Sequence, residues 1–403
     1  EYGRHKVAAA GFDAVVGNPP WIDAWTESPQ EQELRETTYT LWNHRVQLTA
    51  HWDMYIIFIH QALSLLKAGG RHSFVLPSPF ATERYAESLR DHILENYTVE
   101  FFVDFGARTV FPGVSRKVII EGIRNVLPSP ETQVAVYDPE TVVSQNAVIS
   151  HFSPQRLWFE NPRKMFRAHT RKSHAPILAK VEQISEPTGN YFYVNYGAQI
   201  SSKKKGAFSK TRLLNYERTG NAKRCLEGKD ISRYSITWRG LWLDYQPDIM
   251  YGPRAPALFE NRKLLVSKTT GQGFQLLATL DTEQYYCDQR VIVVIDYEAL
   301  KGTTLQTKFS GYEKVDETVT LAYTCALYNS TLLSWYFYIR LATGNLQGEY
   351  SDVVPSSVRA LPIRRITFTT PPEERERLVG EGITEATEWI ESTEGTSVES
   401  VTF

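Results

Sequence analysis

The residues best suited to chemistry are Asn18-Pro19-Pro20-Trp21, directly behind a short apolar run at 14–16. The two prolines fix φ and remove two backbone donors, so the loop is stiff and its carbonyls are free to accept hydrogen bonds. A side-chain amide before them, together with a backbone carbonyl, can accept from an NH2 group. Such a pair suits an exocyclic amine whose lone pair must be freed for attack on a methyl sulfonium. The Trp21 ring offers a face on which a flipped base can stack.

Strands and helices alternate around this loop and must position it. A glycine pair at 69–70 ends the first helical pattern in the manner of a glycine cap. The alternation predicts a mostly parallel α/β sheet, of which four strands are only about half of a usual doubly wound domain. The expected elements are a buried strand at 14–16, helices at 47–67 and 83–96, and strands at 73–76, 99–105 and 117–123.

The run FDAVVGNPPW at 12–21 resembles catalytic motif IV of the γ-class N6-adenine DNA methyltransferases, found in fused type IIG and type I-like restriction-modification enzymes. Residues 53–77 resemble the next helix and strand of that family, and 110–120 resembles its motif VIII. The resemblance implies that Asn18 and the Pro19 carbonyl accept hydrogen bonds from the adenine amine, within the rigid loop that Pro20 completes. Trp21 would stack on the flipped base, and Phe111 would hold its other side.

The resemblance also implies S-adenosylmethionine as the cofactor, with Asp53 and Tyr55 near its adenosine end. An Asp at a helix start is more often a cap, so this assignment has a structural alternative. The family's glycine-rich cofactor motif lies upstream of the NPP loop, and nothing before Asn18 in this sequence matches it. We therefore expect the second half of a Rossmann-like methyltransferase sheet, inactive alone. A missing N-terminal part or a separate subunit would carry the motif.

A basic segment follows the catalytic half. Residues 201–240 contain eleven Lys/Arg and three acidic residues, within a chain of formal net charge -2. Such a patch predicts contacts with the phosphates of double-stranded DNA, although a solvated basic face is the simpler alternative. Residues 227–265, 323–339 and 361–363 also resemble the family's target recognition domains. The expected DNA-binding residues are Lys203, Lys204, Lys205, Lys210, Arg212, Lys229, Arg233 and Lys268.

Together these patterns predict an α/β fold followed by an α+β target recognition domain. The expected parts are residues 1–150 for the catalytic half, 151–366 for DNA recognition and 367–403 for an acidic C-terminal helix or tail. Three distant cysteines argue against a disulfide framework and fit a cytoplasmic protein. The sequence contains no apolar stretch long enough to span a membrane, no phosphate-binding GxxxxGK[ST] loop and no histidine pair that suggests a catalytic metal.

The leading hypothesis is site-specific DNA adenine N6-methylation in a restriction-modification or phage-defence system. A protein or RNA amino-methyltransferase is one alternative, because related loops serve those acceptors; the long basic domain argues against it. A DNA-binding specificity module without catalysis is the other, with the NPPW loop as a relic.

Overall fold

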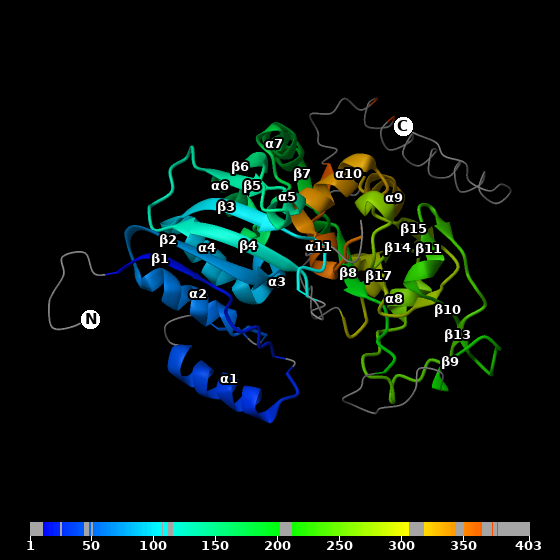
Figure 1. Ribbon diagram of the computed structural model, residues 1–403. Helices are drawn as coiled ribbons and strands as arrows, with labels where there is room; N and C mark the ends of the chain where they lie inside the picture. The colour runs from blue at the N-terminus through cyan, green and yellow to red at the C-terminus, as the bar shows by residue number, and fades with distance from the viewer. Residues whose placement is uncertain are drawn as a thin grey trace. The chain divides into compact units, whose positions relative to one another are not determined.

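The computed structural model divides the chain into two compact units, one up to Ile177 and one from Leu178 (Figure 1). The first unit extends beyond residue 150, where the sequence analysis ends the catalytic half. The reason is that β6 (Ile149–Pro154) pairs with β5 (Gln133–Tyr137), and Trp158 of α6 (Gln155–Glu160) enters the core of the same unit. The structure describes residues 11–24, 26–43, 48–49, 51–106, 108–111, 116–201, 212–305, 318–342, 350–364, 373 and 377.

A six-stranded sheet forms the centre of the first unit, in the order β1-β2-β4-β3-β5-β6. Only the β1/β2 and β3/β5 pairs are parallel, so the sheet is mixed rather than mostly parallel. The link from β3 to β4 includes no helix in its described part, and a crossover of that kind is what a parallel neighbour requires. Strand β4 therefore inserts antiparallel between β2 and β3. The first four strands are β1 (Phe12–Gly17), β2 (Leu66–Pro77), β3 (Thr98–Asp104) and β4 (Val118–Arg124).

The helix expected at 47–67 is shorter in the structure, because α2 runs only from Tyr55 to Ser64. Strand β2 then begins at Leu66 and includes the glycine pair that the sequence analysis assigned to a helix cap. A Cβ at Gly70 would lie 2.7 Å from the Phe12 carbonyl oxygen. Gly70 is therefore required where β1 lies against β2.

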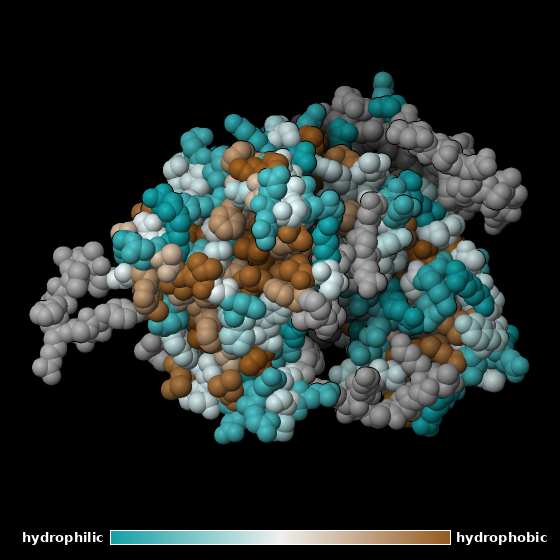
Figure 2. All heavy atoms as spheres, in the orientation of Figure 1, coloured by the Kyte–Doolittle hydropathy of each residue, from teal (hydrophilic) through white to brown (hydrophobic). Residues whose placement is uncertain are grey.

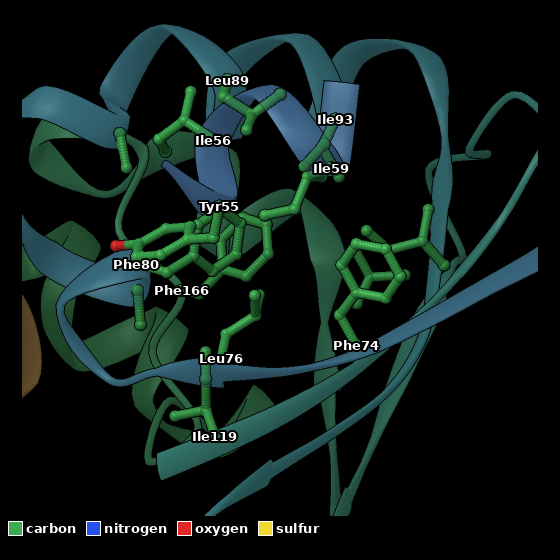
Figure 3. Close-up of a cluster of buried hydrophobic side chains, with 14 of the residues drawn as sticks. Tyr55, Ile56, Ile59, Phe74, Leu76, Phe80, Leu89, Ile93, Ile119 and Phe166 are labelled. Atoms are coloured by element: carbon green, nitrogen blue, oxygen red, sulfur yellow. The ribbon is translucent and has the colours of Figure 1, made fainter. Parts of the chain in front are cut away.

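Helices α2 and α4 (Glu87–Asn96) contribute the apolar side chains that cover one face of the sheet. Figure 3 shows Tyr55, Ile56 and Ile59 of α2 gathered above Leu76 and Phe74 of β2. The helix expected at 83–96 is divided in the structure into a short 3-10 turn, Arg84–Ala86, and α4. This cluster is the main core of the unit.

The opposite face of the sheet, which we call the open face, carries Val16, Val75, Phe101, Ile120 and Tyr137 from five adjacent strands. Strand register places these side chains together, since Val75 pairs with Ile120 and Val103, two residues from Phe101, pairs with Tyr137. Apolar residues gather over these strands in Figure 2. Val16 is 78% exposed, so β1 is an edge strand with an apolar side chain in solvent and not the buried strand expected.

The second unit contains two four-stranded sheets with separate hydrophobic clusters. The antiparallel sheet β15-β14-β17-β8 consists of β8 (Phe192–Tyr196), β14 (Lys263–Ser267), β15 (Ala278–Asp281) and β17 (Val291–Asp296). The sheet β16-β10-β13-β9 consists of β9 (Leu214–Asn215), β10 (Lys223–Leu226), β13 (Trp242–Leu243) and β16 (Tyr286–Cys287). Two small pairs complete the strands, β11 (Ile231–Ser232) with β12 (Ser235–Ile236) and β7 (Ser185–Pro187) with β18 (Pro362–Arg364).

The helical stretch at 320–341 is interrupted. Helix α9 (Leu321–Tyr328) ends at Asn329, whose side-chain amide donates to the Ala278 carbonyl at 2.9 Å. Ser330 then caps α10 (Thr331–Tyr336), which continues into a π-helical turn, η10 (Phe337–Leu341). The Asn-Ser pair thus ties the helices to β15. The remaining helices are α1 (Pro29–Trp42), α3 (Pro79–Thr82), α5 (Pro139–Val143), α7 (Ala175–Gln183), α8 (Ala257–Glu260) and α11 (Pro355–Ala360). The acidic tail lies almost entirely outside the described residues.

Candidate functional site

The loop Asn18-Pro19-Pro20-Trp21 leaves the carboxyl end of β1, as its position behind the apolar run predicts. Asn18 and Pro20 are exposed, whereas Pro19 is buried and anchors the loop. A Cβ at Gly17 would lie 3.2 Å from the Phe74 ring, so the glycine lets the strand end lie close to β2. The Asn18 side chain is consequently presented at the edge of the sheet on a rigid backbone.

The structure brings together the two aromatic residues that the sequence analysis places around a base. The Trp21 and Phe111 ring centroids are 6.2 Å apart, with an interplanar angle of 64°, an edge-to-face contact. Both side chains pack at the open face, next to Val103, Phe105 and Val118. The Trp21 indole N–H is shielded from solvent and has no acceptor among the described residues. A polar group shielded in this way usually has a hydrogen-bond partner. The Trp21 indole N–H therefore has an unused capacity to donate to a ligand.

Arg116 connects three segments at this end of the sheet. Its Nη2 lies 2.5 Å from Oδ2 of Asp23, two residues after Trp21, and its Nη1 lies 3.4 Å from Oδ2 of Asp53. Asp53 precedes α2, and Arg116 follows Phe111 by five positions. One guanidinium therefore spans the NPPW loop, the start of α2 and the loop before β4.

Two hydrogen bonds hold the loop from the other side at the Ile22 carbonyl. The Met54 amide donates to it at 3.1 Å, and Nη1 of Arg35 donates at 2.8 Å. Arg35 belongs to α1, and its guanidinium lies 4.3 Å from the centroid of the Trp52 ring. The backbone just after Trp21 is therefore fixed by α1 and by the start of α2.

Asp53 is only 2% exposed, and this burial raises its pKa to about 6. Arg116 and the backbone amides of Met54 and Tyr55 oppose the shift, whereas the Asp23 charge adds to it. The N-cap residue of α2 is Met54 and no side chain caps this helix, so the described hydrogen bonds do not support the helix-cap alternative. The structure thus gives Asp53 a protein partner, and no contact in it tests the expected role toward a cofactor.

Tyr55, the other expected cofactor residue, is fully buried. Its hydroxyl lies 2.7 Å from the Tyr85 hydroxyl, and its ring packs edge-to-face on Phe80. Burial raises the pKa of the Tyr55 hydroxyl well above its ordinary value. These contacts describe a core residue that packs α2 onto the sheet.

In the second unit, a hollow of about 270 Å³ lies beside the sheet β16-β10-β13-β9. The Arg218 guanidinium lies 5.1 Å from the Trp242 ring centroid, and Lys223 lies 3.5 Å from a carboxylate oxygen of Glu260. The hollow therefore presents cations, acceptors and aromatic faces together. Its lining includes Arg218, Lys223, Arg224, Trp242, Glu260 and Tyr286.

Comparison with known families identifies both units. Residues 3–111 match the Eco57I restriction-modification methylase family, and residues 223–363 match the TaqI-like C-terminal specificity domain. The two matches together cover more than half of the chain, in this order. The first stretch is thus similar to a restriction-modification methylase, and the second to the specificity domain of such enzymes.

Curated methyltransferases of this group share part of the sequence. The Type II methyltransferase M.HincII of Haemophilus influenzae is 26% identical over 184 residues, which cover 43% of this chain and 36% of M.HincII. The Type II restriction enzyme and methyltransferase RM.Eco57I of Escherichia coli is 30% identical over 105 residues, 25% of this chain and 10% of that protein. The match thus spans about a third of M.HincII and less of RM.Eco57I.

A solved structure shares the fold over nearly the whole chain. The Type IIL restriction-modification enzyme MmeI, determined in complex with DNA, superposes with a TM-score of 0.52 at 11% identity. The superposition covers 96% of this chain and 55% of MmeI. The methylase and specificity segments therefore have the fold class expected from the sequence, an α/β sheet followed by an α+β domain.

Within the specificity domain, the expected DNA-binding residues have different surroundings. Lys229 pairs with Glu227 at 2.9 Å, and Arg233 donates to the Asn329 carbonyl at 2.8 Å. Lys268 lies 5.8 Å from the Tyr196 ring centroid. Arg212 is exposed just before β9. Lys203, Lys204, Lys205 and Lys210 lie outside the described residues.

Sequence reasoning missed the residues of the hollow as a group. The charge count of 201–240 included Arg218, Lys223 and Arg224 without distinguishing them from the other cations. Strands β10 and β13 contain four and two residues, too few for a periodic pattern that reveals which side chains share a face. One signal in the sequence was available. A charged Arg224 next to an apolar Cys225, which is buried, indicates that the Arg224 side chain points away from the core.

Two further properties of the described residues bear on the site. No three or more His, Cys, Asp and Glu side chains gather there in a way that could hold a metal ion. Within the same part of the chain, none of the helices has the length and apolar character to cross a bilayer.

Proposed function

We propose that this chain provides the amine-binding loop and the recognition part of a site-specific DNA adenine N6-methyltransferase within a restriction-modification system. The observation that carries the proposal is the placement of Asn18. Its exposed amide follows an edge strand on a backbone stiffened by Pro19 and Pro20, beside the ring pair Trp21 and Phe111. The match of residues 3–111 to the methylase family and of residues 223–363 to a specificity domain supports DNA as the substrate.

In the proposed reaction, the Asn18 side-chain oxygen and the Pro19 carbonyl accept the two N–H groups of the adenine amine. These two hydrogen bonds draw the lone pair of the amine nitrogen out of conjugation with the ring. The lone pair can then attack a methyl group. The developing positive charge on the nitrogen strengthens both hydrogen bonds, which makes the contribution greatest in the transition state. S-adenosylmethionine, the proposed cofactor, would supply the electrophilic methyl group: its methyl–sulfur bond would break as the nitrogen–carbon bond forms, the thioether S-adenosylhomocysteine would leave, and the methylated nitrogen would lose one proton to solvent.

The flipped base can stack at the ring pair only if one geometric condition is met. Because Trp21 and Phe111 meet edge-to-face at 6.2 Å, they do not form a parallel slot. A base that stacks on Trp21 must move the Phe111 edge or use the other face of the indole. The shielded indole N–H supplies a donor to the ligand or to a neighbouring phosphate.

The two residues expected near the proposed cofactor already have protein partners. Asp53 and Tyr55 lie near the loop, but Arg116 holds the Asp53 carboxylate and Tyr85 holds the Tyr55 hydroxyl. We propose that a further α/β segment, in the same polypeptide or in a separate subunit, binds the methionine and ribose portions. Strand β1 is the outer strand of the sheet, where another strand can pair, and the open face offers apolar area for helices.

We further propose that residues 151–366 bind duplex DNA. Lys203, Lys204, Lys205, Lys210 and Arg212 would neutralise phosphates, with Lys229, Arg233 and Lys268 as further candidates. The hollow beside β10 presents guanidinium and carboxylate groups that can reach base edges, as sequence readout requires.

The test is N18A in the assembled enzyme, which we define as this chain with the segment or subunit that supplies the glycine-rich motif. N18A should lower N6-methyladenine formation at least about 10-fold, as measured by mass spectrometry of the nucleosides, while the DNA affinity stays within about threefold. The matched control is N96A, another exposed asparagine of the first unit, and it should retain wild-type turnover. Methylation of protein or RNA by the wild type, with no methylated adenine in DNA, would contradict the proposal.

A further inference from the structure

The NPPW loop and the segment that carries Phe111 are joined by an ion pair as well as by the contact of their two aromatic rings. Arg116 reaches Asp23 on the first loop at 2.5 Å and Asp53 before α2 at 3.4 Å. Neither carboxylate lies on the same segment as Arg116. The guanidinium is therefore the ionic connection between the segments that carry Trp21 and Phe111.

This arrangement differs from an ordinary surface ion pair, which contributes little because water screens it. The Asp53 side chain is 3% exposed and the Asp23 side chain 30%, while the Arg116 side chain is 38% exposed. Removal of Arg116 would leave the ionised Asp53 buried without its cation. The pair is thus costly to break and holds its geometry.

The geometry also depends on the fork of an arginine. Two separate nitrogens of one planar group point to carboxylates that come from different segments. A lysine ammonium is a single point charge and lacks the second fixed donor direction. Lysine at position 116 can preserve the charge but cannot hold both Asp23 and Asp53 at these positions.

We propose that Arg116 is a positioning residue that fixes the segment of Phe111 relative to Trp21, the ring on which the flipped base stacks. This inference rests on the proposed function of the loop. The Ile22 carbonyl, held by Met54 and Arg35, keeps the far end of the loop in place without Arg116. Loss of Arg116 therefore leaves the Phe111 side with its apolar packing but without its ionic tether, and misplacement of about 1 Å costs roughly 100-fold in rate.

The experiment compares R116M and R116K with R71M in the assembled enzyme. Arg71 also pairs with a carboxylate of the same sheet, Glu100 at 2.8 Å, but away from the loop. Three quantities are measured: the single-turnover methylation rate, the affinity for the mapped target duplex, and the fluorescence of 2-aminopurine at the target adenine. The last reports ring stacking on the flipped base and does not respond to a merely structural loss.

We expect R116M to lower the single-turnover rate at least about 30-fold and R116K about 10-fold, with DNA affinity within about threefold of the wild type. The 2-aminopurine emission in R116M should be at least about twofold brighter, because a base without its stacking partner is less quenched. R71M should match the wild type in all three. A rate for R116M within about threefold of the wild type, unchanged emission, or an equal loss in R71M would overturn the proposal.

If R116M unfolds below the assay temperature, the same three quantities are measured for D23N instead. This variant leaves the ion pair of Arg116 with the buried Asp53 intact. D23N should then lower the rate at least about fivefold and brighten the emission, and a wild-type rate would overturn the proposal. N18A separates this inference from the proposed function. Full activity in N18A rejects the function, whereas inactive N18A with fully active R116M rejects only the role of Arg116.

Discussion

Nζ of Lys263 lies 2.5 Å from Oδ2 of Asp281, and both side chains are completely excluded from solvent. The Asp281 carboxylate also accepts from the backbone amides of Glu283 and Tyr285 at 2.7 and 3.0 Å. The pair thus joins β14 to the end of β15 and shapes the turn that leads to β16.

K263M should destabilise the specificity domain by about 3–5 kcal/mol, because it leaves an ionised carboxylate buried without its cation. The double variant K263M/D281L should recover at least about half of this loss, since it removes both charges. Thermal or denaturant unfolding of the three proteins measures the difference. A double variant less stable than K263M would show that the two losses are independent.

The pH–rate profile of methylation should fall on its acidic side with an apparent pKa near 6. The reason is that only the ionised carboxylate of Asp53 holds Arg116. The rate should fall about tenfold per pH unit well below 6 and stay level above about 7. D53N should remove this limb, and an unchanged profile would exclude Asp53 as its source. The charged or titratable groups that face Asp53 are Arg116, Asp23, Arg35, Tyr55 and Tyr85.

The same residue should affect stability with the opposite sign. The folded-state pKa of Asp53, about 6, lies above its ordinary value of 3.8, so the folded chain binds this proton more tightly than the unfolded chain. The contribution of Asp53 to the free energy of unfolding is therefore largest below about pH 4 and is lost as the pH rises through 6. Unfolding of D53N and the wild type at pH 5 and pH 8 measures it; an identical pH dependence would contradict the shift.

Neutralisation of Lys203, Lys204 and Lys205 to glutamine should weaken DNA binding and flatten its salt dependence. The slope of log K against log salt should become shallower by about 0.9 for each phosphate that the triple variant no longer neutralises. K67Q, at a lysine of the first unit that pairs with Asp13, is the control and should leave the slope unchanged. Equal slopes for the triple variant and the wild type would make the lysine run a solvated face.

Residues 1–403 alone should bind S-adenosylmethionine at least about 100-fold more weakly than the assembled enzyme, because they lack the glycine-rich strand-to-helix loop. Calorimetric titration of both preparations measures the ratio. Low-micromolar affinity of the isolated chain would mean that the described sheet already contains a complete cofactor site.

The sequence predicted the placement of the NPPW loop directly after a strand, because a stiff proline pair behind an apolar run is a local pattern. It could not predict that Val16 is exposed. An apolar residue type alone does not show whether other side chains of the same chain cover it. It also missed Arg116 as a bridge. Arg116 and Asp23 are 93 positions apart, and only the folded sheet brings the ends of their segments together.

The helix expected at 47–67 shows a different limit of sequence reasoning. A glycine pair after apolar residues with helical spacing is typical of a cap, but the requirement at Gly70 comes from the Phe12 carbonyl of a distant strand. Likewise, the direction of β4 depends on the path of the connection that precedes it. Both features are tertiary, and local periodicity contains no information on them.

The separate hydrophobic clusters of the two units have a consequence for how such proteins diversify. The core of the methylase segment draws on residues between 48 and 168, and the clusters of the specificity domain draw on residues between 178 and 363. A genetic exchange that replaces the second stretch leaves Asn18, Trp21, Phe111 and Arg116 in their own packing environment. Under the proposed function, new target sequences can therefore arise by recombination between genes without rebuilding the NPPW loop.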